Sequence, residues 1–163
     1  MDKVRKFRRR PGFTLIEVLV TAGIIAVLAG AILPMAKVAL QRERETTLRR
    51  DLRVIREAID AYKKMADDKK IESDADTDGY PPTLDALVKG VKLKGDAKAK
   101  SGPEKIIKFL RRIPPDPLTS SAEWGLLSNQ DPPDAASWGG QNVFDVYTKR
   151  RGKALDGTKY RDW

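Results

Sequence analysis

The stretch RRRPGFTLIEVLV, residues 8–20, places three arginines before a Pro-Gly pair, and an apolar run begins directly after the glycine. That run covers residues 13–33, 21 positions of which only Thr14, Glu17 and Thr21 are polar. A helix of about 20 apolar residues can cross a bilayer, so the segment 13–33 is predicted to span a membrane. A carboxylate costs ~2.5–3.5 kcal/mol at the centre of a span and less near its end. The presence of Glu17 therefore needs a reason.

The net charge of +9 is concentrated ahead of the apolar run. Residues 1–12 hold six of the 32 basic residues and one of the 23 acidic residues, so the rest of the chain carries only +4. Basic residues on the cytoplasmic side of a membrane span set its orientation. Nucleic-acid binding would need a basic stripe on folded structure, and no such stripe is evident, so no nucleic-acid partner is predicted.

The residue types exclude several classes of enzyme. The chain contains no cysteine and no histidine, which rules out Cys/His zinc sites, cysteine nucleophiles and histidine-relayed serine triads. It also contains no G-x-S-x-G motif and no glycine-rich phosphate loop. An enzyme is therefore not predicted, and any exported domain must be stable without disulfides.

The sequence after the apolar run predicts that the helix continues. Pro34 has no N–H to donate, so we expect a kink or local unwinding there. Beyond it, apolar residues recur at gaps of 4, 3, 4, 3 and 4, which is helical spacing: Leu48, Leu52, Ile55, Ile59, Tyr62 and Ala66. The residues between them are mostly charged, as in an amphipathic helix with one packed face. We predict one long helix over 13–66, followed by a head over 67–163.

The head is predicted to be small and of mixed structure. Thr83 is a candidate N-cap for a short helix that begins at Leu84. Residues 89–105 are rich in lysine and glycine and are predicted to be a mobile loop. Residues 106–113 suit a short helix or strand, and NVFDVYT, residues 142–148, is the best strand candidate. Together with the long helix, these elements predict an α+β fold.

Three interpretations of the N-terminal segment compete. It could be a signal peptide cut after Ala29-Gly30-Ala31, so that the mature chain starts at Ile32, or a simple anchor. Neither of these explains Glu17. The third interpretation is that PGFTLIEVLV, residues 11–20, resembles the N-terminal signature of type IV pilin-like proteins.

The resemblance implies a specific processing and assembly pathway. A prepilin peptidase is expected to cut between Gly12 and Phe13, which removes the leader 1–12, and Phe13 is then N-methylated. Glu17 becomes the fifth residue of the mature chain and is expected to attract the N-terminal ammonium of a neighbouring subunit. A buried carboxylate that faces a cation is strongly compensated, so the pair would set the register of subunit addition.

The head narrows the resemblance. YPPTLDAL (80–87), IPPDPLT (113–119), NVFDVYT (142–148) and a closing Asp-Trp occur in this order and resemble the head of the major pseudopilin of type II secretion systems. This implies a structural subunit that polymerises into a periplasmic pseudopilus and helps to export folded proteins. It also implies a single-pass protein of the bacterial inner membrane with a periplasmic head. The implied partners are further copies, minor pseudopilins, the prepilin peptidase, an inner-membrane assembly platform and, before assembly, membrane lipid.

Two alternatives remain. One is a type IV pilin for adhesion or motility, although many of those close a C-terminal loop with a disulfide that this chain cannot form. The other is a signal-anchored periplasmic enzyme, which the missing catalytic residue types disfavour.

Calcium is the one cofactor that the resemblance raises, although nothing in the sequence requires a cofactor. The major pseudopilins hold calcium in an acidic C-terminal loop, where this chain has only Asp156 and Asp162, next to the basic run 149–153. A second candidate is DADTDG, residues 74–79, in which Asp74, Asp76 and Asp78 have the spacing of an EF-hand loop. Pro81 and Pro82 argue against a complete EF-hand, and a solvated connection is the alternative.

Overall fold

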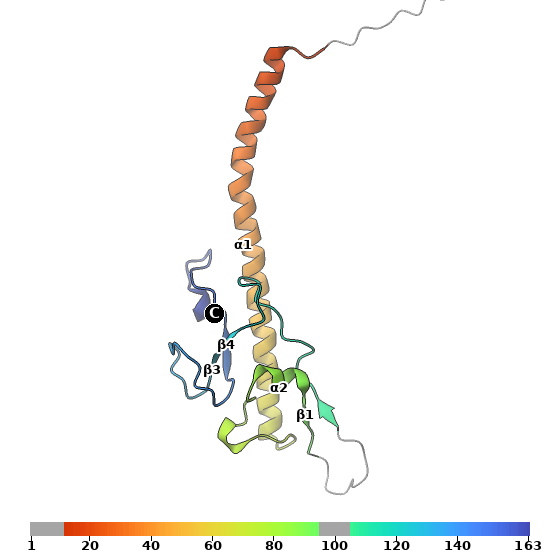
Figure 1. Ribbon diagram of the computed structural model, residues 1–163, viewed down its shortest axis with the longest axis vertical. Coiled ribbons are helices and arrows are strands. Elements are labelled where there is room, and N and C mark those ends of the chain that lie inside the picture. The colour runs from red at the N-terminus through yellow and green to blue at the C-terminus, as the bar shows by residue number, and fades with distance from the viewer. Residues whose placement is uncertain (1–11, 95–104) are drawn as a thin grey trace, which may run out of the picture. The chain divides into compact units, whose positions relative to one another are not determined.

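The computed structural model describes residues 12–94 and 105–163 of the chain. Its largest element is the helix α1, Leu15–Asp67, with 53 residues (Figure 1). The chain divides into two units, one that ends at Leu40 and one that covers Gln41–Trp163. The second unit holds the end of α1, the short helix α2 and two small antiparallel sheets. The fold is therefore α+β, as predicted.

Pro34 lies within α1. A proline removes one main-chain hydrogen bond, here the one to the carbonyl of Gly30, and its ring crowds the preceding turn. The described backbone is nevertheless helical on both sides of Pro34. The expectation that α1 unwinds locally at Pro34 is therefore wrong. The other expectation, a kink, stays a prediction.

The second half of α1 buries one stripe of side chains. Six residues at helical spacing have exposed fractions of 9% or less: Leu48, Leu52, Ile55, Ile59, Tyr62 and Ala66. These are the six residues that the sequence pattern predicted, and their burial confirms the stripe. They share one core with residues of the head, among them Ile71, Leu87, Val143 and Val146, and the ring of Tyr62 contacts that of Phe109 at 5.3 Å between centroids.

The short helix α2, Leu84–Lys89, lies where the sequence predicted it. Thr83 has the extended conformation of an N-cap residue, but its side chain makes no capping hydrogen bond. Leu84 and Leu87 are buried. The helix is followed by Gly90, whose φ of 87° favours glycine. A Cβ at this position would also lie only 2.5 Å from the Ile107 carbonyl oxygen, so no larger residue fits.

Two antiparallel strand pairs complete the head. β1, Val91–Lys92, pairs with β2, Ile106–Ile107, in the register Val91 to Ile107. β3, Gly125–Leu127, pairs with β4, Asp145–Tyr147, in the register Leu126 to Val146. The prediction of a loop over 89–105 is thus wrong at Lys89, which ends α2, and at 91–92, where pairing with β2 outweighs the polar local sequence. Residues 95–104 lie outside the described part of the chain.

The PPDPLT motif, residues 114–119, forms a turn around a buried carboxylate. Asp116 is fully buried and accepts hydrogen bonds from the backbone N–H of Leu118, at 2.8 Å, and from the hydroxyl of Thr148. Trp124 donates its indole N–H to the Pro114 carbonyl at 2.9 Å. A buried polar group is stable only when its hydrogen bonds are satisfied. The motif therefore fixes the connection between β2 and β3.

Candidate assembly site

The start of α1 is organised around Thr14. The Thr14 carbonyl accepts from the Val18 N–H at 3.2 Å, and its hydroxyl accepts from the Glu17 N–H at 3.3 Å. Thr14 therefore caps the helix, and Glu17 lies three residues later, which is the spacing of a capping box. This role of Thr14 was not predicted from the sequence, although the pattern T-x-x-E at residues 14–17 indicates it.

Gly12 and Phe13, the two residues of the predicted cleavage site, precede the helix. Both are exposed and non-helical, and 82% of the Phe13 side chain is accessible. The backbone at the Gly12–Phe13 bond is therefore not engaged in helical hydrogen bonds. Residues 1–11, the rest of the predicted leader, lie outside the described residues.

Glu17 is an exposed carboxylate in the first turn of α1. The free N–H groups of a helix N-terminus carry partial positive charge, which favours a carboxylate at this position. Among the described residues, no cation forms an ion pair with Glu17. Its carboxylate is thus available to a cation from another chain.

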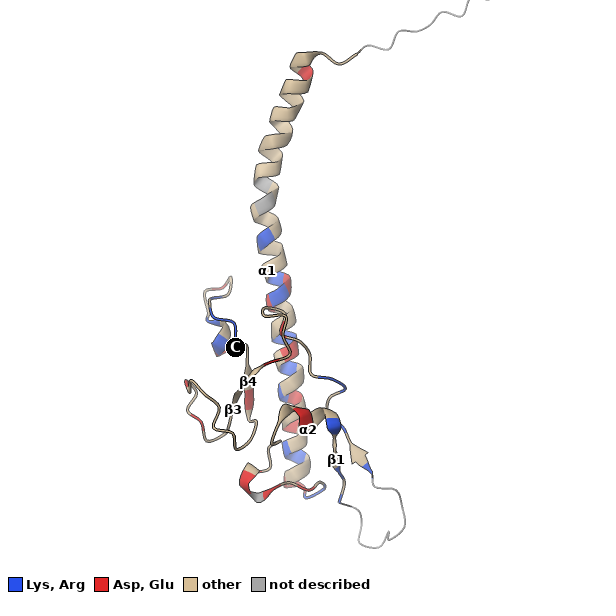
Figure 2. Ribbon diagram, viewed as in Figure 1, with Lys and Arg blue, Asp and Glu red and all other residues tan. Residues whose placement is uncertain are grey.

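The first unit presents apolar side chains on every side of the helix. The large apolar residues from Phe13 to Leu40 whose side chains the structure describes are 43–82% exposed, and Figure 2 shows no charged residue on α1 between Glu17 and Lys37. In the described part of the chain, α1 is the one helix that is long and apolar enough to cross a membrane, by length and composition. An apolar surface of this extent marks a membrane or protein contact.

Side chains of α1 hold the C-terminal segment. The Arg56 guanidinium donates to the Asp145 carboxylate at 2.6 Å and 3.2 Å, to the Val146 carbonyl at 3.1 Å and to the Trp163 carbonyl at 2.6 Å. The Arg49 guanidinium lies 4.0 Å from the centre of a Trp163 ring. Because a planar guanidinium donates in several directions at once, one residue fixes both β4 and the end of the chain.

Glu45 forms further contacts between α1 and this segment. Its carboxylate accepts from the Tyr160 hydroxyl at 2.8 Å, the Leu155 N–H at 3.1 Å and the Gln41 amide at 2.9 Å. Burial and this carboxylate together raise the pKa of Tyr160. The sequence pattern did not identify Glu45, Arg49 or Arg56, because charged residues on a helix outside the apolar stripe are usually solvated.

The C-terminal candidate for calcium is already occupied by other partners. Asp156 accepts from the hydroxyl and the N–H of Thr158, at 2.5 Å and 2.9 Å, and pairs with Arg49 at 2.7 Å. These contacts, with those of Thr158 first, lower the pKa of Asp156. Calcium needs six to eight oxygen ligands, several of them charged. Asp156, which is already paired with Arg49, and Asp162 do not supply that ligand set as they lie in this fold.

The second candidate, Asp74, Asp76 and Asp78, also forms no ligand cluster. The segment contains a short 3-10 helix, Ala75–Thr77. The Asp78 carboxylate accepts hydrogen bonds from the side-chain amides of Asn129 at 2.8 Å and Gln130 at 3.3 Å, and these bonds lower the pKa of Asp78. Within the described ranges, no group of three or more acidic side chains lies close enough to hold a metal ion. Calcium binding stays a prediction for measurement.

Comparisons with known proteins agree with this N-terminal geometry. The family model for the prokaryotic N-terminal methylation motif matches residues 7–33, the stretch that holds Gly12, Phe13 and Glu17. The chain therefore carries a prokaryotic N-terminal methylation motif at the start of its long apolar helix. It is 29% identical over 144 residues to type II secretion system core protein G of Pseudomonas aeruginosa, which covers 86% of this chain and 83% of that protein. No solved structure matches the chain.

Proposed function

We propose that this chain is a structural subunit of a type II secretion pseudopilus, processed by prepilin peptidase and polymerised through α1. The observation that carries the proposal is the methylation motif at the start of an exposed apolar helix. The similarity to a type II secretion core protein extends through the head and favours a pseudopilus over an adhesive pilus.

The geometry of the N-terminus supports a two-stage use of α1. Before assembly, the apolar residues 13–33 span the inner membrane as its single anchor, and cleavage at Gly12 leaves an ammonium on Phe13. In the filament the same surface contacts neighbouring helices. Lipid tails are as apolar as leucine, so apolar packing alone gives little preference for one register.

Glu17 supplies the missing preference. Its carboxylate lies one helical turn from the new N-terminus, so it can pair with the ammonium of an adjacent subunit. A charge in a low-dielectric core is costly when unpaired and stabilised when a cation faces it. Only the register that brings the two charges together is therefore favourable.

The head and the remaining partners follow from this role. We propose that residues 67–163 lie in the periplasm, since the basic leader favours the cytoplasmic side. Minor pseudopilins and an inner-membrane assembly platform would bind the growing filament, and partner proteins would supply the energy. The role of the chain itself is structural rather than catalytic.

Mass spectrometry of the N-terminal peptide tests the proposal. Protein purified from membranes should begin at N-methylated Phe13, and a chain with Gly12→Leu should keep its leader because the peptidase no longer recognises the site. A start at Ile32 in the unmodified chain would contradict the proposal and support a signal peptide.

A further inference from the structure

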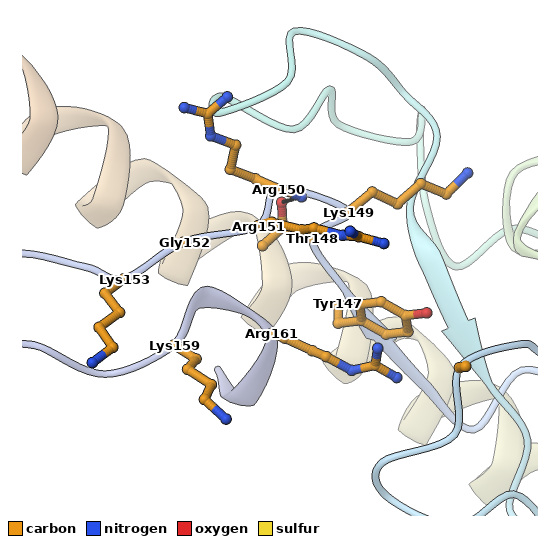
Figure 3. A pocket seen from close by; sticks show the side chains of 10 residues that line it. Tyr147, Thr148, Lys149, Arg150, Arg151, Gly152, Lys153, Lys159 and Arg161 are labelled. Atoms are coloured by element: carbon orange, nitrogen blue, oxygen red, sulfur yellow. Dashed lines mark hydrogen bonds between the residues drawn. The ribbon is translucent and has the colours of Figure 1, made fainter.

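A basic cleft lies beside the C-terminal turn of the head. Its volume is about 750 Å³, and Tyr147 and Thr148 form part of its lining. In Figure 3 the side chains of Lys153 and Lys159 extend in the same direction, and Arg161 lies along the Tyr147 ring. Six cationic side chains line the cleft: Lys149, Arg150, Arg151, Lys153, Lys159 and Arg161.

Few of these cations are neutralised within the chain. Lys149 pairs with Glu123 at 3.3 Å, and the Arg161 guanidinium stacks over the Tyr147 ring at 4.6 Å. The side chains of Arg151, Lys153 and Lys159 form no ion pair or hydrogen bond with the described residues. Like charges held close together repel, so an anion in the cleft would relieve this repulsion.

An acidic segment of the same chain complements the cleft. Residues 72–78, ESDADTD, contain four acids and no cation, and all four acidic residues are exposed. Backbone contacts fix the start of this segment to the end of α1, where the Lys70 N–H donates to the Met65 carbonyl at 3.0 Å. Figure 2 shows this red segment and the blue C-terminal loop at different heights along α1.

The two regions of one chain cannot meet. The cleft loop is attached to α1 at Glu45 and Arg49, through Leu155 and Asp156, whereas the acidic segment is attached near Met65. At 1.5 Å per residue, Arg49 and Glu45 lie about 24 and 30 Å from Met65 along the helix axis. Any contact between the acidic segment and the cleft must therefore join two chains.

We propose that the basic cleft of one copy binds the acidic segment 72–78 of a neighbouring copy. This inference rests on the proposed function, because a polymer of parallel chains supplies copies displaced along the axis. The loop that carries the cleft is attached near the end of the head at which α1 enters, and the acidic segment is attached near Met65, at the other end. A subunit farther from the membrane would thus receive the acidic segment of a subunit nearer to it.

The chemistry suits a contact that sets orientation. Arginine binds carboxylates through two parallel hydrogen bonds, which gives geometric specificity. Complementary charges raise the rate of correct encounter and penalise like-charge pairings. The contact would therefore align the heads, while Glu17 sets the register of the helices in the core.

Charge reversal with rescue tests the proposal in cells that express the full chain and assemble it. Arg151→Glu with Lys153→Glu should lower the yield of sheared filaments about tenfold, and Asp74→Lys with Asp76→Lys should do the same. The chain with all four substitutions should recover most of the yield, because every interface then carries the exchanged charges. Arg111→Glu with Arg112→Glu, two exposed cations outside the cleft, is the matched control and should assemble normally.

The outcomes separate this inference from the proposed function. Normal filaments from the cleft variant would overturn the inference and leave the proposed function intact. A loss that the acidic-segment exchange does not restore would also overturn it, and would point to another anion, such as a lipid headgroup. If the unmodified chain forms no filament, the proposed function fails, and the inference fails with it.

Disulfide cross-linking gives a second measurement that does not depend on charge reversal. The chain has no cysteine, so when Ser73→Cys copies are mixed with Lys159→Cys copies, any disulfide that joins two unlike copies must be the predicted cross-link. Both positions are exposed. Lys108→Cys, exposed elsewhere on the head, replaces Ser73→Cys in the control pair. Equal cross-linking in both pairs, or none in either with filaments present, would overturn the inference.

Discussion

The two parts of α1 use apolar residues in opposite ways. Up to Leu40, the large apolar side chains that the structure describes surround the helix and are exposed, whereas from Gln41 to Asp67 most large apolar side chains form one buried stripe beneath the head and Val54 remains exposed. The first part therefore has a surface that another molecule must cover, and the second part has already found its cover within the chain. One helix combines an assembly surface with the support of a folded domain.

Truncating a buried apolar side chain in the second part should destabilise the head strongly, whereas truncating an exposed one in the first part should not. Ile59→Ala removes a fully buried residue and should destabilise the head by about 2–5 kcal/mol, because a cavity remains in the core. The melting temperature of the head, measured on the full chain in detergent, should fall by roughly 10–40 °C. Ile25→Ala, 65% exposed in the first part, is the control and should leave the head transition unchanged. Equal shifts in both variants would show that the two parts do not unfold separately.

Glu17→Val tests the first part of α1, where we expect a loss of assembly without a loss of membrane insertion. It removes a polar group whose cost in a membrane is at most ~2.5–3.5 kcal/mol, so insertion should be unimpaired. Filament yield, measured after shearing from cells, should fall about tenfold or more because the partner of the ammonium is lost. Thr21→Val, one turn along the same helix, should have little effect. Normal assembly of Glu17→Val would refute the pairing of Glu17 with the N-terminus.

The sequence was most informative where one residue type repeats at a fixed spacing. Most of the stripe from Leu48 to Ala66 could be predicted, because burial of one helix face imposes its period directly on the sequence; only the small Ala58, which is also buried, was missed. The cleavage motif could be identified for a different reason, since a carboxylate within an apolar run is unfavourable without a function. Both signals are local and need no knowledge of the head.

Long-range polar contacts could not be predicted in this way. Arg56 and Trp163 are 107 positions apart, and nothing near Arg56 distinguishes it from the exposed arginines around it. The strand β1 was missed for the same reason, because its pairing with β2 lies across a lysine-rich segment. Such contacts depend on how the head folds against α1, which the local pattern does not specify.

Arg56→Ala measures what these contacts contribute. Arg56 and Asp145 are about one-third exposed, so solvent screening limits the loss, and we expect about 1–2 kcal/mol of destabilisation in urea unfolding. Arg56→Lys should recover only part of it, because an ammonium cannot reproduce the guanidinium's fork of donors. Arg53→Ala, an exposed neighbour, is the control. A loss no larger than that of the control would show that the C-terminal segment is held by packing alone.

The smallest expected effect is that of calcium on the head. An ion bound only by the folded state adds ~2.7 kcal/mol at a hundredfold excess over its dissociation constant, which would raise the melting temperature by roughly 10–20 °C. Because Arg49 and Thr158 already engage Asp156, we expect the curves of the full chain in calcium and in chelator to coincide. A shift would contradict this, and variants would then locate the ion. If the calcium-dependent shift is lost in Asp156→Ala but not in Asp76→Ala, calcium binds in the C-terminal loop, where the ion would have to displace Arg49. The reverse pattern would place it at residues 74–78, far from the arginines that hold the C-terminus, and the metal would then stabilise the opposite end of the head.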